Sequence, residues 1–469
     1  MSSVTMDAKD LRDDASPAEQ RRGLLAACEV ALEAARAAGA TEAEAFAGAS
    51  VEATCQLEGP AIKLTRENAH QALGLRVFHE GRLGFVASNQ LDPESLRQLA
   101  GDAVALAKRS PVDEHNGLIA ENAVGEGPDL CSPELWDRGP EDAVTGGRAL
   151  LERLGGIDPR ISIDSGSFSL RRGSSALVNS RGARAAQSDG GQSFYVMGLA
   201  AEGDDVGSFD YDSDFLRQDA GLDEALARVT GNFAENVLGN LGARAAESYK
   251  GPVLFGPSAF ADVFVRPLVS ACSALAVQRG RSALADKLGE QIGTSALSIT
   301  DDPTDRDLAG AGAFDREGVP TRRFELVTDG VLRAWLHNGY SAAVDGVEPT
   351  GHAAGGTRSV PGLGPHALCV APGDGGDREA MLASLGQGLL VQRFSGSVDP
   401  VSGDFSGVAK SSRWVSGGQV THGVGETLIS GNAFEALGSI LSLSSAAERR
   451  GGSMRLPWAL VDGLSVTAG

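Results

Sequence analysis

The alternation of apolar and polar residues divides the chain into a mixed succession of helices and strands. A period close to 3.6 residues places Leu24, Cys28 and Ala31 on one face of a helix that ends at Gly39. Residues 43–88 alternate in short runs and predict a sheet of several short strands. The first half therefore begins with an amphipathic helix followed by a sheet.

The pattern continues with helices that cover this sheet. A hairpin turn is expected at Glu80 and Gly81, and Asp92 followed by proline is typical of the N-cap of a helix that extends to Lys108. Residues 110–140 are rich in Pro, Gly and acidic residues and predict a long surface connection. The next expected elements are a helix at 141–154, strands at 161–200, a loop at 202–215 and a helix from Gly221 to about 247.

A new unit is expected to begin near residue 246. It starts with the strand PVLFG and the helix PSAFADVFVRPLVSACSALAVQ, and continues as a glycine-punctuated series of antiparallel strands. We therefore predict an α+β protein with three parts. These are a flexible tail at 1–17, an N-terminal α/β domain at 18–245 with a short-stranded sheet and covering helices, and a largely antiparallel β domain with helices at 246–469.

Charge and cysteine usage limit the partners and the cellular compartment that we expect for this protein. The formal net charge of −21 should repel nucleic-acid phosphates and anionic membrane surfaces. Five scattered cysteines form neither a disulfide framework nor a CxxC metal knuckle, which suits a reducing compartment. The first 20 residues lack the basic and apolar regions of a secretory signal, and no apolar run approaches the roughly 18 residues that span a bilayer. We expect a cytoplasmic protein without direct nucleic-acid or membrane partners.

The sequence offers little catalytic chemistry of its own. The one His-Glu pair, His79-Glu80, falls at the expected hairpin turn with no second histidine at helical spacing. No two of His337, His352, His366 and His422 are three to five residues apart, which leaves only a cluster formed by folding. Neither a G-x-S-x-G nucleophile elbow in a strand-to-helix setting nor a nucleotide-binding glycine motif is present. We therefore predict no catalytic residue, metal ligand or cofactor in this chain.

Five strings in the second half carry a family resemblance. They are GPVLFGPSAFADVFVRPLVSACS at 251–273, AFDREGVPTRRFELVTDGVLRAWLHNGYSA at 313–342, TGHAAGG at 350–356, GDFSG at 403–407, and Gly431-Asn432. In order and spacing they resemble the TldD/PmbA family of two-subunit metalloproteases. The strings TGHAAGG and GDFSG resemble the "STGHAGG" and "GDYSRG" strings of its TldE-like, or PmbA-like, branch.

The resemblance implies a division of labour. The family's TldD-like subunit bears HExxxH and binds zinc, whereas the TldE-like subunit has lost that motif and pairs with it. Because this sequence contains no HExxxH, it resembles the TldE-like subunit. The resemblance implies a heterodimer that cleaves unfolded or flexible peptides, with zinc in the partner subunit. The sequence leaves open whether a homodimer forms where the partner is missing.

The candidate substrate-binding residues lie in the two glycine-rich strings. Glycine-rich strand edges allow a peptide to add as an extra strand through main-chain hydrogen bonds, although the same glycines suit turns with positive φ. The candidates are Gly351, His352, Gly355, Gly356, Gly403, Asp404, Phe405 and Gly407. Phe405 is equally suited to fill the core.

Two other functions remain open at this level. One is a stand-alone regulatory or binding protein, in line with family names that speak of modulating DNA gyrase. The other is a family member that tailors a peptide-derived natural product, which the departure from the family pattern at 357–368 leaves open. A neighbouring gene encoding HExxxH would favour the protease subunit.

Overall fold

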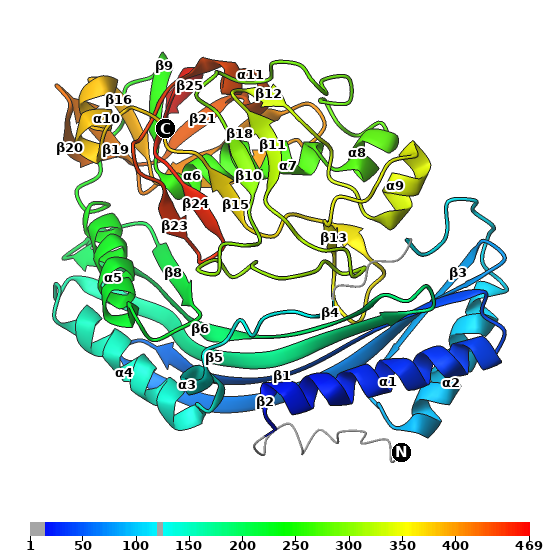
Figure 1. The fold of residues 1–469 in the computed structure, drawn as a ribbon. Helices are drawn as coiled ribbons and strands as arrows, with labels where there is room; N and C mark the ends of the chain where they lie inside the picture. Colours follow the sequence, from blue (N-terminus) through cyan, green and yellow to red (C-terminus); the bar gives the residue numbers. More distant parts are fainter. Residues whose placement is uncertain (1–14, 120–124) are drawn as a thin grey trace.

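A long curved sheet organises the molecule, with helices on one face and the C-terminal half of the chain on the other (Figure 1). The computed structural model describes residues 15–119 and 125–469. It confirms the predicted α+β class, with largely antiparallel strands in both halves. The predicted tail at 1–17 lies mostly outside the described residues.

The curved sheet has the order β3-β2-β1-β5-β6-β4, with β7 and β8 also paired to β6. Its strands are β1 (Glu42–Glu58), β2 (Ala61–His79), β3 (Arg82–Ser88), β4 (Gly125–Glu126), β5 (Ile161–Asn179), β6 (Arg184–Glu202), β7 (Asp205–Val206) and β8 (Asp210–Leu216). With 17 and 19 residues, β1 and β2 are longer than the short strands that the alternation predicted. Glycines that suggested turns lie inside the strands, where they allow close packing. A Cβ at Gly84, for example, would lie 2.1 Å from the Ala103 carbonyl oxygen of a covering helix.

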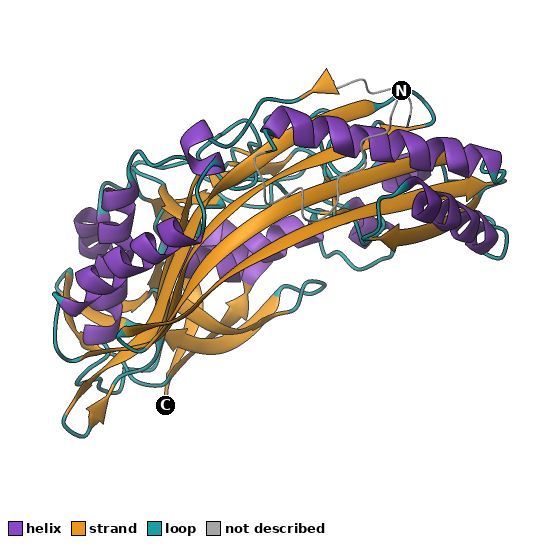
Figure 2. Cartoon of the chain, turned by 90° about the horizontal axis from the view of Figure 1, so that it is seen from below, coloured by secondary structure: helices purple, strands orange, loops and turns teal. Residues whose placement is uncertain are grey.

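Five described helices accompany this sheet, and Figure 2 shows helices lying on one of its faces. They are α1 (Pro17–Ala37), α2 (Pro93–Ala107), α3 (Pro133–Trp136), α4 (Pro140–Gly155) and α5 (Leu222–Leu238). The first two bury small residues such as Cys28 and Ala103 against one end of the sheet. At the other end, α4 and α5 bury Leu150 and Phe233 against Phe168 and Phe194. The sheet therefore has one apolar face and leaves its other face to the C-terminal half.

The predicted loop at 202–215 is wrong, because most of it forms β7 and β8. The three aspartates at 210, 212 and 214 suggested a solvated loop. Instead Asp210 and Asp214 are buried, at 1% and 2% exposure. Asp210 accepts a hydrogen bond from Ser411, and Asp214 pairs with Arg228 and Arg449. Partners distant in sequence thus allow an acidic segment to form a strand.

The C-terminal half contains a nine-stranded sheet, a six-stranded sheet and the pair β13 (Ala353–Ala354) and β14 (Gly362–Leu363). The nine-stranded sheet consists of β9 (Tyr249–Phe255), β16 (Gln387–Val391), β17 (Arg393–Val398), β18 (Asp404–Lys410), β19 (Arg413–Ser416), β20 (Gln419–Gly423), β21 (Thr427–Asn432), β22 (Ile440–Leu443) and β25 (Ala459–Ala468). The six-stranded sheet consists of β10 (Ile299–Asp301), β11 (Phe324–Thr328), β12 (Val331–Leu332), β15 (Leu368–Val370), β23 (Glu448–Arg450) and β24 (Met454–Leu456).

The helix predicted after PVLFG is divided into several parts. It comprises α6 (Pro257–Phe260), a π-helical turn (Ala261–Val265), α7 (Arg266–Ala271) and α8 (Ala274–Gln278). The remaining helices are α9 (Gly339–Asp345), α10 (Arg378–Leu385), α11 (Ala433–Ala436) and a 3₁₀ turn (Leu437–Ser439). No helix in the described ranges is long and apolar enough to cross a membrane.

Arginines bind the two halves together where α5 and β8 meet the C-terminal half. Arg413 donates to the Asn240 side chain and to the carbonyl oxygens of Glu235 and Asn236, at 2.9–3.1 Å. Arg217 donates to the carbonyl oxygens of Leu308, Ala309 and Ala311 at 2.8–3.4 Å. Guanidinium groups thus satisfy carbonyl oxygens in the last turn of α5 and in the loop at 308–311 that would otherwise lack partners.

The contact between Gly146 and Phe168 gives a test of how α4 packs on the sheet. A Cβ at Gly146 of α4 would lie 2.5 Å from the Phe168 ring, whereas at Gly231 of α5 it would meet nothing within 4 Å. Gly146→Ala should therefore lower the free energy of unfolding by roughly 1–3 kcal/mol. The control Gly231→Ala should leave it unchanged or raise it by up to about 1 kcal/mol. Urea denaturation measures the free energy of unfolding of both variants. Equal stability of the two would contradict the close packing of Gly146 against Phe168.

Candidate functional site

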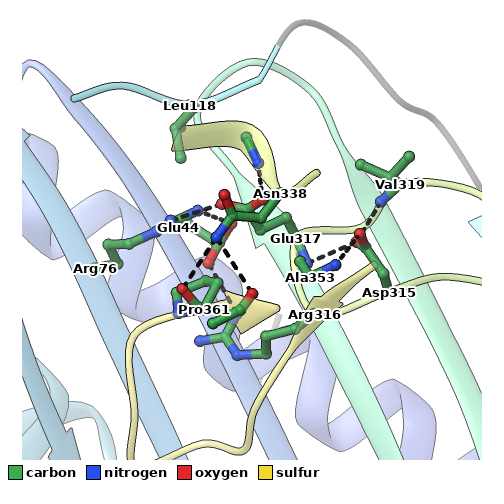
Figure 3. Close-up of polar contacts among 12 residues, drawn as sticks. Glu44, Arg76, Leu118, Asp315, Arg316, Glu317, Val319, Asn338, Ala353 and Pro361 are labelled. Carbon is green, nitrogen blue, oxygen red and sulfur yellow. Dashed lines mark hydrogen bonds and ion pairs between the residues drawn. The ribbon is translucent and has the colours of Figure 1, made fainter. Parts of the chain in front are cut away.

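The sheet and the C-terminal half meet at a buried cluster of four charged residues, Glu44, Arg76, Arg316 and Glu317 (Figure 3). Glu44 and Arg76 are paired neighbours on β1 and β2. Because side chains alternate along a strand, Glu44 points away from the helices that cover its neighbours Ala43 and Ala45. The segment 313–319 of the C-terminal half supplies Arg316 and Glu317. All four side chains are 7% exposed or less.

Each carboxylate in this cluster has an arginine partner at hydrogen-bonding distance. Arg76 donates to Glu44 and to Glu317, both at 2.8 Å, and Arg316 donates to Glu44 at 2.9 Å. Burial opposes the charge of Arg76, but the two carboxylates outweigh that effect and raise the pKa of its guanidinium group. Arg316 also lies 4.2 Å from the centroid of the Phe46 ring. The charges are balanced within the cluster, which makes their burial possible.

The string FDREG forms the turn that presents Arg316 and Glu317. Asp315 accepts the backbone N–H groups of Glu317, Val319 and Ala353 at 2.9–3.0 Å, and Gly318 has a φ of +81°. Burial and the neighbouring Glu317 raise the pKa of Asp315 to about 7, against the opposing effect of these N–H donors. The turn is thus fixed by one buried carboxyl group.

The four C-terminal histidines form only a partial cluster, at His352 and His366. His352 lies between Asp301, 3.1 Å from its Nε2, and Thr350, 2.8 Å from its Nδ1. His366 has Nε2 2.7 Å from the Gly351 carbonyl oxygen, and the two rings are 5.7 Å apart. Within residues 15–119 and 125–469 no group of three or more His, Cys, Asp or Glu side chains could hold a metal ion.

The His79-Glu80 pair lies in the predicted hairpin turn between β2 and β3. His79 pairs with Arg82 across the turn, and Glu80 has a φ of +52°. The ring Nδ1 of His79 lies 2.9 Å from the Gly39 carbonyl oxygen.

Two of the candidate substrate residues, Gly355 and Gly356, line a groove of about 470 Å³ on the face of the sheet opposite the helices. The lining of the groove combines apolar residues such as Phe46 with polar ones, which include Ser50, His70, Arg171 and Gln187. Gly355 has a φ of +136°, and a Cβ there would lie 2.8 Å from Ser359 Oγ. A Cβ at Gly356 would meet nothing within 4 Å. Gly356 thus borders open space, whereas Gly355 serves a turn.

Gly351 and His352 are not among the residues that line this groove. Gly351 has a φ of +80°, with the Pro320 carbonyl oxygen 3.0 Å from a Cβ built there. His352 is 2% exposed.

The other four candidates lie in a different sheet, on and before β18. Phe405 is buried with its ring near Phe264 and Phe394, as the core interpretation expected. Gly403 has a φ of +84°, and Asp404 accepts a hydrogen bond from Asn432 at 3.0 Å. Because β18 is paired with β17 and β21, Gly407 has no free edge to offer a peptide. In the described part of the chain no hydrogen bond or ring contact joins these four residues to Gly351–Gly356.

Family models cover most of the chain. The PmbA/TldA metallopeptidase domain 1 matches residues 43–107, the central domain matches 133–248 and the C-terminal domain matches 248–468. The chain belongs to the PmbA/TldD family. Where we predicted one N-terminal domain, the family divides the region into two, although both contribute strands to one sheet.

Individual members of the family show similarity along nearly the whole chain. Metalloprotease PmbA of Escherichia coli O157:H7 is 29% identical over 397 residues, or 83% of this chain and 85% of that protein. The Metalloprotease PmbA homolog of Haemophilus influenzae is 29% identical and covers 92% of this chain and 93% of its own. The crystal structure of TldE from Thermococcus kodakarensis has the same fold, with a TM-score of 0.86 at 22% identity over 94% of this chain and 100% of that one.

The ionic cluster predicts a large effect of removing one charge. Arg76→Met would leave Glu317 without its arginine partner in the interior, which should lower the free energy of unfolding by roughly 3–5 kcal/mol. The matched control is Arg66→Met on the same strand, where the side chain is exposed and the change should stay within about 0.5 kcal/mol. Urea denaturation measures both, and an Arg76→Met protein as stable as the control would contradict the structural importance of the cluster.

Proposed function

We propose that this chain is the non-catalytic, TldE-like subunit of a two-subunit metalloprotease. It pairs with a TldD-like subunit that carries HExxxH and the catalytic zinc, and the pair cleaves unfolded or flexible peptides. We place the pair in the cytoplasm, an assignment supported by five cysteines that are all free thiols.

The π-helical turn Ala261–Val265 is the observation that supports the non-catalytic role. The histidines of HExxxH are five residues apart, and the i→i+5 bonding of a π-turn brings residues at this spacing onto one face. In this chain the Arg266 N–H donates to the Ala261 carbonyl oxygen, which gives these two residues that spacing, and Asp262 follows Ala261 as Glu follows His in the motif. Asp262 and Arg266 form an ion pair at 3.2 Å. The backbone thus suits the motif, whereas Ala261 and Arg266 offer no zinc ligand at the positions of its two histidines.

The groove at Gly356 is our candidate for the surface of this subunit that contacts the peptide. It lies between the sheet and segment 355–358, and the polar side chains in its lining suit main-chain groups of an extended peptide. Of the eight candidate residues, Gly355 and Gly356 alone line it. This subunit would then position the peptide while the partner supplies the metal.

The π-turn assignment predicts a gain of metal binding. The triple substitution Ala261→His, Asp262→Glu, Arg266→His would place two imidazoles and a carboxylate on one face of the turn, next to the acidic groups Asp210 and Asp212 of the adjacent cleft. The purified variant should take up zinc well above the wild-type background in elemental analysis. Ala261→His alone is the control and should not. If the folded triple variant takes up no more zinc than this control, the π-turn is not the site of the motif.

Co-expression with a HExxxH-bearing homologue tests the function itself. We expect a complex of the two chains in size-exclusion chromatography, zinc in the complex but not in this chain alone, and cleavage of β-casein, an unfolded protein, by the complex. Gly356→Val, which fills open space, should preserve the complex and slow cleavage. The control Gly438→Val, at a site where an added Cβ also meets nothing within 4 Å, should leave the rate unchanged.

Two results would contradict this proposal. One is near-stoichiometric zinc in the wild-type chain alone, and the other is the absence of any complex with a HExxxH-bearing homologue. Normal cleavage by the Gly356→Val pair would remove only the assignment of the groove.

A further inference from the structure

The edge strand β17 of the nine-stranded sheet has a free side. It pairs with β18 along all six residues with no bulge, and among the residues described no strand pairs with its other side. Its centre, Ser395-Gly396-Ser397, is exposed. Main-chain N–H and C=O groups at such an edge are available for pairing with another strand.

Four other edge strands in the described structure are protected in ways that β17 is not. Gly84 in β3 packs against the backbone of α2, β23 consists of Glu448, Arg449 and Arg450, and the pairing of β20 contains a bulge. The edge strand β12 has two residues. Coverage, charge, bulges and short length are the usual devices that prevent an edge from pairing. Beyond Arg393, β17 has neither a charge nor a proline.

A groove runs along this edge between β17 and the helical segment that contains the π-turn. It has a volume of about 340 Å³, with Phe394, Gly396 and Val398 on the strand side. The helical side carries Asp262, Arg266 and Ser270. Side chains of Arg266 and Asp262 are 58% and 36% exposed, so their ion pair is accessible from the groove. A strand added to β17 would place alternate side chains against this charged wall.

We propose that β17 binds an extended peptide segment by strand addition, with Arg266 contacting an acidic side chain of that peptide. The main chain of β17 supplies affinity without sequence preference, which suits substrates that share only a lack of structure. Arg266, on the helical side of the groove, supplies a preference for peptides with acidic side chains. This inference rests on the proposed function for the identity of the ligand, and it names a peptide site separate from the groove at Gly356.

Binding to the isolated chain tests the proposal without the partner subunit. The probes are two fluorescein-labelled ten-residue peptides, one alternating Thr and Glu and one alternating Thr and Lys, together with a Thr/Glu peptide that has prolines at its two central positions. The prolines remove amide protons from both edges of the peptide. Fluorescence anisotropy should show binding of the Thr/Glu peptide and at least tenfold weaker binding of its proline form. Hydrogen exchange should show protection of the amides of residues 393–398 on binding.

Charge reversal tests the role of Arg266. In Arg266→Glu the ratio of the two dissociation constants, Thr/Lys over Thr/Glu, should fall at least fivefold. The control Arg281→Glu makes the same change at an exposed arginine outside the groove and should leave the ratio unchanged. Circular dichroism establishes that both variants are folded.

Three outcomes would overturn the proposal: no protection at 393–398 at saturating peptide, equal binding of the proline peptide, or an unchanged charge ratio in folded Arg266→Glu. If Arg266→Glu instead abolished complex formation with the HExxxH-bearing homologue and left peptide binding intact, the edge would be a subunit interface and the proposal wrong. Failure of peptide binding by a chain that still forms the complex would leave the proposed function standing.

Discussion

The placement of the C-terminal half on the sheet depends on the buried cluster of Glu44, Arg76, Arg316 and Glu317. Two arginines and two carboxylates are individually unfavourable in a protein interior, and they become tolerable only as a set. Glu44 and Arg76 pair with each other within the sheet, whereas the pairs Arg76–Glu317 and Arg316–Glu44 form only when the FDREG turn is docked on it. The cluster therefore specifies one arrangement of the halves, in a way that apolar contact alone does not.

Arginines also provide partners for buried polar groups along the rest of the contact between the halves. Arg217 and Arg413 bind backbone carbonyls, and Asp214 lies between Arg228 and Arg449. A planar guanidinium group makes several directed hydrogen bonds at once, which is why arginine suits such a surface better than lysine. An acidic chain thus uses many of its arginines internally.

The sequence indicated the class and most elements of the fold, because apolar periodicity and helix caps are local signals. Ser16 and Asp92 cap α1 and α2. It did not indicate β8, whose aspartates are satisfied by partners about 200 residues away such as Ser411 and Arg449. For the site, the strings of the resemblance located the FDREG turn and the glycines at 355 and 356. Glu44 and Arg76 were missed, although a charged residue inside the apolar runs AEAF and LGLRVF is the signal that could have found them.

The length of β1, β5 and β6 affects how this protein can change over evolution. The boundary between the first two family domains falls between residues 107 and 133, yet β1 on one side pairs with β5 on the other from Glu44 to Glu58. A recombination event at that boundary would exchange one side of a continuous hydrogen-bonded ladder for an unmatched one. The ladder stays whole only when the first two domains are exchanged together. A junction near residue 248, where the C-terminal domain begins, would leave the ladder intact but would still have to preserve the ionic cluster between the halves.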